Sequence, residues 1–473
     1  MDDDMDDHPE PRDGAVVLGA GVAGLLAARV LAERFDRVTV VERDELPDSG
    51  PAFRPGVPQS RHAHVLWSKG VDLIEDLLPG TTARLLAGGA VLLDLPRDFL
   101  WLSPADWFLP VHGARALLGS RELLDRTLRG QVLRDARIRV RARCTATGLV
   151  AAADGRSVAG VELRSGERLP ARLVVDATGR TSRAPDWLAA LGHPVPATTR
   201  YDSRLGYSSR SYAVPPDPAR RWRGMYVQGR PDSPRGGVLV PLEGDRWLAT
   251  LIGNGDHAPP TAEEEFLGFA RSLRSPALHD ALRDAQPLSS PVGFRNTANE
   301  RRHYERLEHA PDGFLVLGDA ACRFNPVYGH GMTVAALAAD ALREELRTLS
   351  PREVPGAVRR IQRSTAAAAE TAWQIATSED LRYPQTDGPP PDRTTRIMQR
   401  YMSRVIVGAN ADPAVAARFF GVLSLSATPD TLLGPATMLR VLSRWRRPAS
   451  PHTTPYPSHH APPGARQDPK ETA

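Results

Sequence analysis

Apolar residues near the start of the chain form two short runs separated by a helical pattern. Residues 15–18 and 37–41 have the length and valine content of buried strands, and residues 22–32 form an Ala- and Leu-rich stretch typical of a helix. This strand–helix–strand order predicts a parallel sheet. Two later apolar runs, residues 173–175 and 314–317, each lead into a glycine-containing loop and are expected to join the same sheet.

The pattern changes in the middle of the chain and again towards its end. From residue 201 to 253, short apolar stretches alternate with Pro, Gly and Asp, which predicts an antiparallel sheet in a second domain. From residue 336 to 447, Ala and Leu recur at helical spacing, with breaks at residues 384–391 and at Pro413. We expect this helical region to serve mainly in packing.

Together these patterns predict an α/β protein with a Rossmann-like nucleotide-binding domain, a mixed antiparallel β-sheet substrate domain and a helical C-terminal region. The ends of the chain lack the apolar content that ordering requires, so both are predicted to be disordered tails. The predicted boundaries are 1–13 for an acidic tail, 14–195 with 295–350 for the nucleotide-binding domain, 196–294 for the sheet domain, 351–447 for the helical region and 448–473 for a second tail.

Composition narrows the function classes. The 473 residues carry a formal net charge of +4, and the basic residues are spread along the chain, which argues against a nucleic-acid partner. Two cysteines, Cys144 and Cys322, are too few for a disulfide framework or a thiolate metal site. The acidic start does not resemble a secretory signal, and no apolar run approaches the ~20 residues of a membrane span. We therefore expect a cytoplasmic protein without a metal and without integral membrane association.

A glycine-rich motif follows the first predicted strand. Gly19, Gly21 and Gly24 are spaced for a tight turn, for approach of a pyrophosphate to the backbone and for close helix packing. Glu42 lies at the end of the second strand, where a carboxylate can bind an adenosine ribose, and its neighbour Arg43 is included in the candidate site. The motif predicts dinucleotide binding and leaves FAD and NAD undivided.

The segment at residues 318–332 separates these two cofactors. It resembles the Gly-Asp motif of the para-hydroxybenzoate-hydroxylase-like flavin monooxygenases, through Gly318, Asp319 and the Pro- and Gly-containing loop that follows. The resemblance implies an FAD-binding domain in which Asp319 binds the ribityl hydroxyls and the amides of Gly331 and Met332 face the flavin pyrimidine edge. The alternative is that Gly318 and Asp319 merely end a strand and cap a helix.

Two further segments fit the same family. Arg121 matches an Arg-x-x-Leu helix whose Arg contacts the FAD phosphates, although an Arg on a solvated helix face is the alternative. In residues 176–183, Thr178 stands where these hydroxylases carry the Asp of an Asp-Gly pair linked to NAD(P)H. Reducing electrons are therefore expected from NAD(P)H directly or through a separate flavin reductase.

Residues 58–66 resemble a segment of the polyene epoxidases of polyether ionophore biosynthesis, of the lasalocid epoxidase type. Arg61 in this segment is a candidate for binding FAD phosphate, whereas His62 and His64 are expected to be structural. His330, inside the segment at residues 318–332, is the one candidate catalytic residue, with a plain hydrogen-bonded loop histidine as the alternative.

The resemblance implies an FAD-dependent monooxygenase that uses O2 and a C4a-hydroperoxyflavin to epoxidise alkenes of an apolar polyene polyketide, in secondary metabolism and antibiotic biosynthesis. The chemistry belongs to the cofactor, so no acid–base pair is required. Hydroxylation of an aromatic polyketide and a non-catalytic dinucleotide-binding role remain alternatives. Five residues could line an apolar substrate cavity, although for each one singly an ordinary core position is favoured: Tyr207, Tyr212, Met225, Tyr226 and Trp247.

Overall fold

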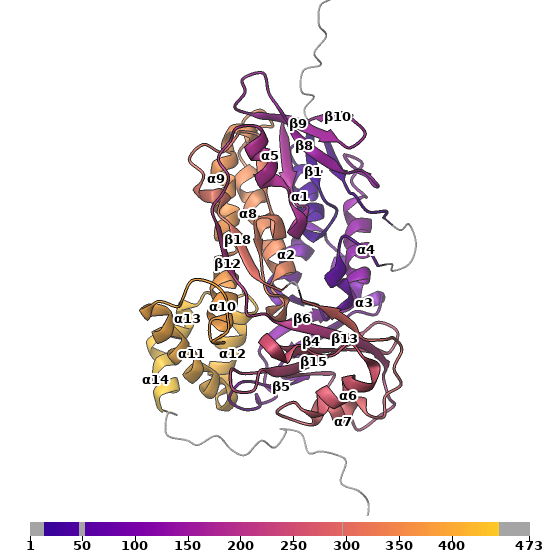
Figure 1. The fold of residues 1–473 in the computed structure, drawn as a ribbon, viewed down its shortest axis with the longest axis vertical. Coiled ribbons are helices and arrows are strands. Elements are labelled where there is room, and N and C mark those ends of the chain that lie inside the picture. The colour runs from indigo at the N-terminus through magenta and orange to yellow at the C-terminus, as the bar shows by residue number, and fades with distance from the viewer. Residues whose placement is uncertain (1–13, 47–52, 296, 444–473) are drawn as a thin grey trace, which may run out of the picture.

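Five parallel strands form one sheet, in the order β19-β11-β1-β2-β7 (Figure 1). The four apolar runs predicted to share a sheet therefore do so. Their bounds are β1 Gly14–Leu18, β2 Arg37–Val41, β7 Ile138–Arg141, β11 Leu173–Asp176 and β19 Phe314–Val316. The computed structural model describes residues 14–46, 53–295 and 297–443, so the predicted tails at 1–13 and 448–473 lie outside the described residues.

Helices cover one face of this sheet and a small antiparallel sheet covers the other. Helix α1 packs on α8, α2 and α4, and its alanines allow the helices to approach closely. These helices are α1 Val22–Leu31, α2 Ser68–Leu77, α3 Thr81–Ala87, α4 Arg121–Val132, α8 Gly331–Leu346 and α9 Val354–Ala367. The opposite face carries β8 Ala146–Ala151, β9 Val158–Leu163, β10 Arg168–Pro170 and α5 Ala184–Ala190.

A six-stranded sheet forms the second lobe, in the order β17-β13-β16-β15-β14-β5. Its central strands are antiparallel, as predicted for residues 201–253, with Tyr207 opposite Ile252. The bounds are β5 Phe99–Leu102, β13 Gly206–Ala213, β14 Gly224–Val227, β15 Arg235–Leu242, β16 Arg246–Gly253 and β17 Val292–Phe294. Helices α6 Glu263–Arg271 and α7 Ala277–Leu282 pack on one face.

Strand β5 comes from a segment placed by sequence in the nucleotide-binding domain, yet it pairs in parallel with β14. Strand β5 therefore belongs to the sheet of the second lobe. The domain boundaries proposed from sequence stay a prediction. Two three-stranded sheets join the lobes, made of β3 Val65–Trp67, β4 Val91–Leu95 and β6 Ala114–Leu118, and of β12 Thr198–Tyr201, β18 Asn299–Arg302 and β20 Cys322–Arg323.

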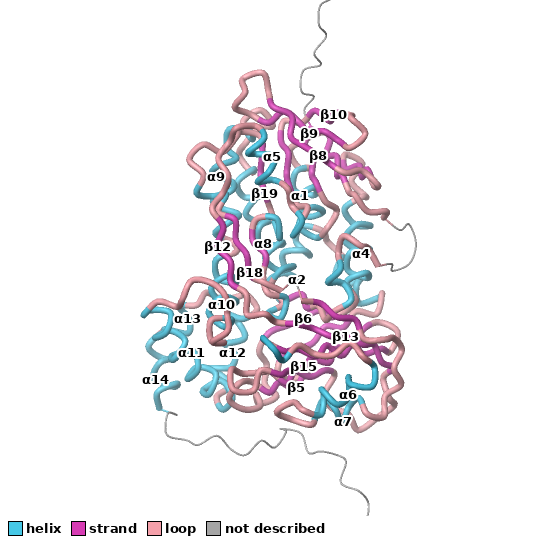
Figure 2. Tube along the Cα trace, viewed as in Figure 1, coloured by secondary structure: helices cyan, strands magenta, loops and turns pink. Residues whose placement is uncertain are grey.

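The C-terminal region is helical, as predicted, and lies beside the six-stranded sheet (Figures 1 and 2). Its helices are α10 Glu370–Asp380, α11 Arg393–Ala411, α12 Pro413–Leu423, α13 Asp430–Leu433 and α14 Pro435–Ser443. Asp392 caps α11 by accepting the Thr395 amide at 2.7 Å, and Asp412 caps α12 ahead of Pro413. Within residues 14–46, 53–295 and 297–443, no helix has both the length and the apolar character needed to cross a bilayer.

Candidate functional site

One cavity of 1360 Å³ lies between the parallel sheet, the six-stranded sheet and the C-terminal helices. Both glycine-containing loops line it, although about three hundred residues separate them in the chain. The volume exceeds the ~300–1,000 Å³ common for one small ligand. The cavity can therefore hold a dinucleotide and a second molecule.

Each glycine of the first motif has its own reason to be glycine. Gly19 has φ +97°, and a Cβ there would lie 2.5 Å from the Ala177 carbonyl oxygen. A Cβ on Gly24 would lie 1.9 Å from the Gly19 carbonyl oxygen, because α1 packs directly against the loop. A Cβ on Gly21 would meet no heavy atom of the described chain within 4 Å. Gly19 and Gly21 line the cavity, whereas Gly24 packs beneath the loop.

Two helices begin at the cavity without a side-chain cap. Helix α1 follows Gly21, and helix α8 follows His330, and neither residue caps its helix with a side-chain hydrogen bond. Gly21 at the first terminus and Gly331 and Met332 at the second line the cavity. Free amide groups and the positive end of each helix dipole favour an anion or a carbonyl oxygen there. The residues present thus fit an anionic dinucleotide such as FAD.

Charged side chains gather where β2 and α4 approach the glycine loop. Glu42 is buried and accepts the Ala20 amide at 2.7 Å and the Asp44 amide at 2.9 Å. Arg121 donates from Nε to Asp125 at 2.7 Å and also lines the cavity. The neighbouring Arg43 lines the cavity and donates to the Thr181 hydroxyl at 3.2 Å.

Sequence reasoning missed Arg54 in this group. Its buried guanidinium donates to Asp125 at 2.9 Å and lies 3.6 Å from a Glu42 carboxylate oxygen. Arg54 thereby connects the acid of β2 with the arginine of α4. It follows a stretch of sequence without periodicity, so no sequence signal distinguishes it from the many other arginines.

The second motif lies beside the first, since both follow the carboxyl ends of strands in the parallel sheet. Gly318 has φ +61°, and a Cβ there would lie 2.7 Å from the Ala23 Cβ of α1. Asp319 lines the cavity with its carboxylate 3.6 Å from Nε of Arg180, which lines it too. The Asp319 carboxylate therefore faces the cavity, where it could accept hydrogen bonds from hydroxyl groups of a ligand.

Thr178 is turned towards protein rather than towards solvent. Its amide and its hydroxyl donate to the buried Asp176 carboxylate at 2.9 and 2.6 Å, and Ser182 donates at 2.6 Å. Burial raises the pKa of Asp176, and these donors act in the opposite direction. The Asp176 carboxylate therefore holds the loop of residues 177–181 against the cavity.

Arg61 and His330, like Gly24, do not line the cavity. Arg61 is exposed, and its guanidinium lies 3.9 Å from the centre of the Phe53 ring. His330 is buried, and its Nε2 donates to the Leu423 carbonyl at 2.9 Å. Burial lowers the pKa of His330 to about 4, so its imidazole is neutral at pH 7. The His330 hydrogen bond ties the loop before α8 to the end of α12. His330 thus corresponds to the alternative of a plain hydrogen-bonded loop histidine.

His62 and His64 both line the cavity, and burial lowers the pKa of each to about 4. His62 Nδ1 is hydrogen bonded to the Ser209 hydroxyl at 2.8 Å, and His64 Nδ1 to the His62 carbonyl at 2.7 Å.

Among the described residues, no three His, Cys, Asp or Glu side chains are grouped for a metal ion. Cys322 is buried, which raises the pKa of its thiol.

The far end of the cavity is apolar and aromatic. Of the five proposed lining residues, Tyr207 and Tyr226 line it, whereas Tyr212, Met225 and Trp247 pack beneath α6 and α7 on the other face of the sheet. The alternation of side chains along a strand decides this division. Sequence reasoning missed Trp101 and Phe108 because β5 was not predicted in this sheet; other lining residues here are Phe294, Val238, Val240 and Ile252.

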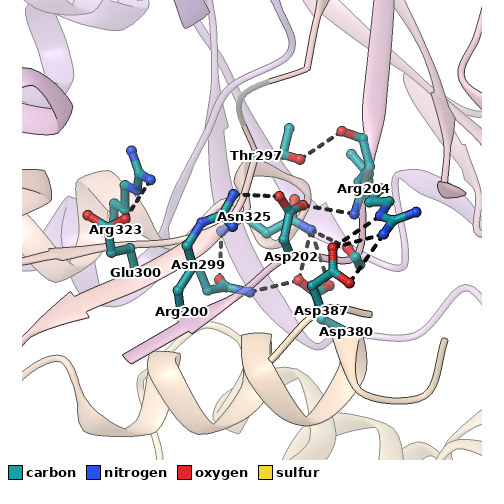
Figure 3. Close-up of polar contacts among 12 residues, drawn as sticks. Arg200, Asp202, Arg204, Thr297, Asn299, Glu300, Arg323, Asn325, Asp380 and Asp387 are labelled. Atoms are coloured by element: carbon teal, nitrogen blue, oxygen red, sulfur yellow. Dashed lines mark hydrogen bonds and ion pairs between the residues drawn. The ribbon is translucent and has the colours of Figure 1, made fainter. Parts of the chain in front are cut away.

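A buried carboxylate supports the loop between Gly318 and α8 (Figure 3). Asp380 of α10 accepts hydrogen bonds from Asn299 at 2.7 Å, from Asn325 at 3.1 Å and from the Tyr328 hydroxyl at 2.8 Å. The Tyr207 hydroxyl donates to Asn325 at 3.3 Å, so the network reaches the cavity wall. Burial raises the pKa of Asp380 to about 6.

The comparisons with known proteins agree with this geometry. Residues 14–350 match the family described as FAD binding domain. Protein Rv3254 of Mycobacterium tuberculosis (strain ATCC 25618 / H37Rv) is 32% identical over 428 residues, which cover 88% of this chain and 90% of that protein.

Solved structures share the fold at low identity. A flavoprotein/dehydrogenase from Cytophaga hutchinsonii is 16% identical with a TM-score of 0.65, covering 92% of this chain and 98% of its own. PqsL, a probable FAD-dependent monooxygenase from Pseudomonas aeruginosa, is 18% identical with a TM-score of 0.57, covering 78% and 97%. The chain therefore belongs to the FAD binding domain family and is an FAD-dependent oxidoreductase with a mixed α/β fold.

Proposed function

We propose that this protein is a monooxygenase that inserts one oxygen atom of O2 into an alkene of an apolar polyene, with epoxidation of a polyketide in secondary metabolism as its role. One observation supports this most. The residues predicted to bind the nucleotide line the same cavity as an aromatic, apolar wall. The resemblance of residues 58–66 to polyene epoxidases points to the same substrate class.

Residues at different positions in the cavity would bind different parts of FAD. Gly21 and the start of α1 would bind the FAD pyrophosphate. Glu42 would bind the adenosine ribose, and Asp319 would bind the ribityl chain. Arg43 and Arg121 would add positive charge near the phosphates. The bound FAD supplies the oxygen-activating chemistry.

The substrate end would orient the alkene and exclude water. Trp101, Tyr226 and Phe294 give wide apolar surfaces against which a conjugated chain can lie. The starts of α1 and α8 would stabilise negative charge on the cofactor.

The test is oxidation of a polyene ester by the FAD-loaded protein with O2, NADPH and a flavin reductase. We expect a product heavier by one oxygen atom in which vinyl proton signals are replaced by epoxide proton signals. A parallel reaction with a phenolic polyketide provides the comparison. Oxygen incorporated only into the aromatic ring would replace epoxidation by hydroxylation, and purified protein that stays colourless after FAD addition would contradict both.

We further propose that a separate reductase supplies the electrons, since Thr178 replaces the Asp of the family's Asp-Gly pair. When oxygen-free FAD-loaded protein is mixed with NADPH alone, the flavin absorbance should decay slowly, and a reductase should accelerate the decay. Rapid bleaching by NADPH alone would show direct reduction instead.

A further inference from the structure

The cavity reaches the protein surface at two places with different chemistry. Near the glycine loop, most of the exposed residues that line it are polar, such as Arg43, Thr181 and Arg183, beside the exposed prolines Pro55 and Pro58. At the other end, Met398 of α11 and Leu433 of α13 line the cavity and are 37% and 42% exposed. A side chain that lines a cavity and is also exposed marks an opening. The second opening is therefore bordered by the apolar Met398 and Leu433 and by uncharged polar groups, since Thr394 and Gln374 also line the cavity and are exposed.

The nucleotide accounts for the first opening. Arg43 lies directly after Glu42, at the end of β2 where the adenosine portion is expected. A bound FAD would therefore extend from this opening inward to α8. The opening at Met398 and Leu433 lies on the C-terminal helices, away from the β2 end of the site.

Apolar side chains continue inward from the second opening. Helices α11 to α13 contribute Met402, Ile406 and Leu432 to one wall. Trp101 and Tyr226 of the six-stranded sheet belong to the same apolar cluster of side chains as Met402. Methionine side chains are flexible and adapt to irregular apolar shapes. A long apolar molecule could thus keep contact with the protein from the surface to the flavin end.

Helix α10 and the start of α11 add hydrogen-bonding groups to this passage. Gln374 and Ser378 line the cavity one helical turn apart. Such groups suit oxygen atoms carried at intervals on an apolar chain. The helical region, expected from sequence to serve in packing, also forms part of the cavity wall.

We propose that the substrate, a long apolar chain bearing uncharged oxygen groups, reaches the flavin through the opening between α11 and α13, and that Met398 and Leu433 control its passage. This inference rests on the proposed function and names the route and shape of its substrate.

The experiment narrows the opening with Met398→Trp and Leu433→Trp, made separately in the full chain. Leu439→Trp is the matched control, because Leu439 is 71% exposed on the neighbouring α14 and does not line the cavity. Binding of a conjugated trienoate ester to the oxidised FAD-loaded protein is followed by stopped-flow flavin absorbance, and FAD affinity is measured by titration. Met398→Ala and Leu433→Ala, which widen the opening, provide a second pair.

We expect ester association about tenfold slower in either Trp variant, unchanged or faster in the Ala variants, and unchanged in Leu439→Trp. FAD affinity should stay the same in all of them. Association at the wild-type rate in both Trp variants would overturn the proposed route, as would loss of FAD affinity without slower ester binding. Because binding needs no turnover, a protein that binds the ester by this route but forms no oxygenated product would contradict the proposed function alone. Wild-type protein that binds FAD but no ester would overturn both.

Discussion

At the residue scale, the glycine loop shows how strictly backbone geometry limits the sequence. Gly19 and Gly24 touch each other and the β11 loop, whereas Gly21 has open space where a cofactor phosphate is expected. The motif was recognisable from sequence because its spacing encodes local turn and helix geometry. Arg61 resembles a cofactor residue in sequence, yet it ends a short 3-10 helix, Pro58–Arg61, where its exposed side chain lies on Phe53 outside the cavity.

The glycines allow two substitutions with separable effects. Gly24→Ala should destabilise the fold by about 2 kcal/mol or more, since its Cβ would overlap the Gly19 carbonyl. Gly21→Ala should leave stability within about 1 kcal/mol but weaken FAD binding, because its Cβ projects into open space that the pyrophosphate would fill. Urea unfolding of the FAD-free protein and FAD titration measure the two effects. Equal loss of stability in both variants would contradict the assignment.

At the scale of elements, the loop bearing Arg54 is tied to α4 by a shared carboxylate. Asp125 accepts from Arg54 at 2.9 Å and from Arg121 at 2.7 Å, and all three side chains are buried. Removing one member of such a group leaves charges buried without compensation. Strand β2, helix α4 and the Arg54 loop therefore depend on one another.

Asp125→Ala should lower the free energy of unfolding by about 3–5 kcal/mol, since two buried guanidinium groups lose their common partner. The matched control is Asp72→Ala, which removes an Asp–Arg115 pair of 2.6 Å whose side chains are both about half exposed. That change should cost at most about 1 kcal/mol. Chemical unfolding of both variants decides the matter; similar values would mean that the Asp125 group contributes little.

At the scale of the whole molecule, Asp380 joins the C-terminal helices to the flavin-side loop. Its carboxylate, on α10, accepts hydrogen bonds from Asn299, the first residue of β18, and from Asn325, which precedes α8 (Figure 3). A burial-raised pKa of about 6, against an ordinary value of 3.8, favours the protonated folded state. This contribution is complete below the unfolded pKa and is lost as the pH rises through about 6.

The free energy of unfolding of the wild type should therefore fall, relative to Asp380→Asn, by about 2 kcal/mol between pH ~4 and pH ~7. The neutral amide does not titrate, so any other effect of the substitution adds a constant offset. Urea unfolding across this pH range measures the difference. A difference between the two proteins that does not change with pH would contradict a raised pKa at Asp380.

The sequence by itself determined the elements whose signals are local: the βαβ start, the strands that return to its sheet, the glycine loop with Glu42, and the Gly318–Asp319 turn. Periodicity, turn geometry and helix ends act over a few residues, so a linear pattern can carry them. Only the tertiary structure decided which face of each strand meets the cavity, that β5 joins the six-stranded sheet, that Arg54 reaches Glu42, and that α10 to α13 border the cavity. Those arrangements depend on contacts between segments far apart in the chain, where packing of whole elements overrides any local preference.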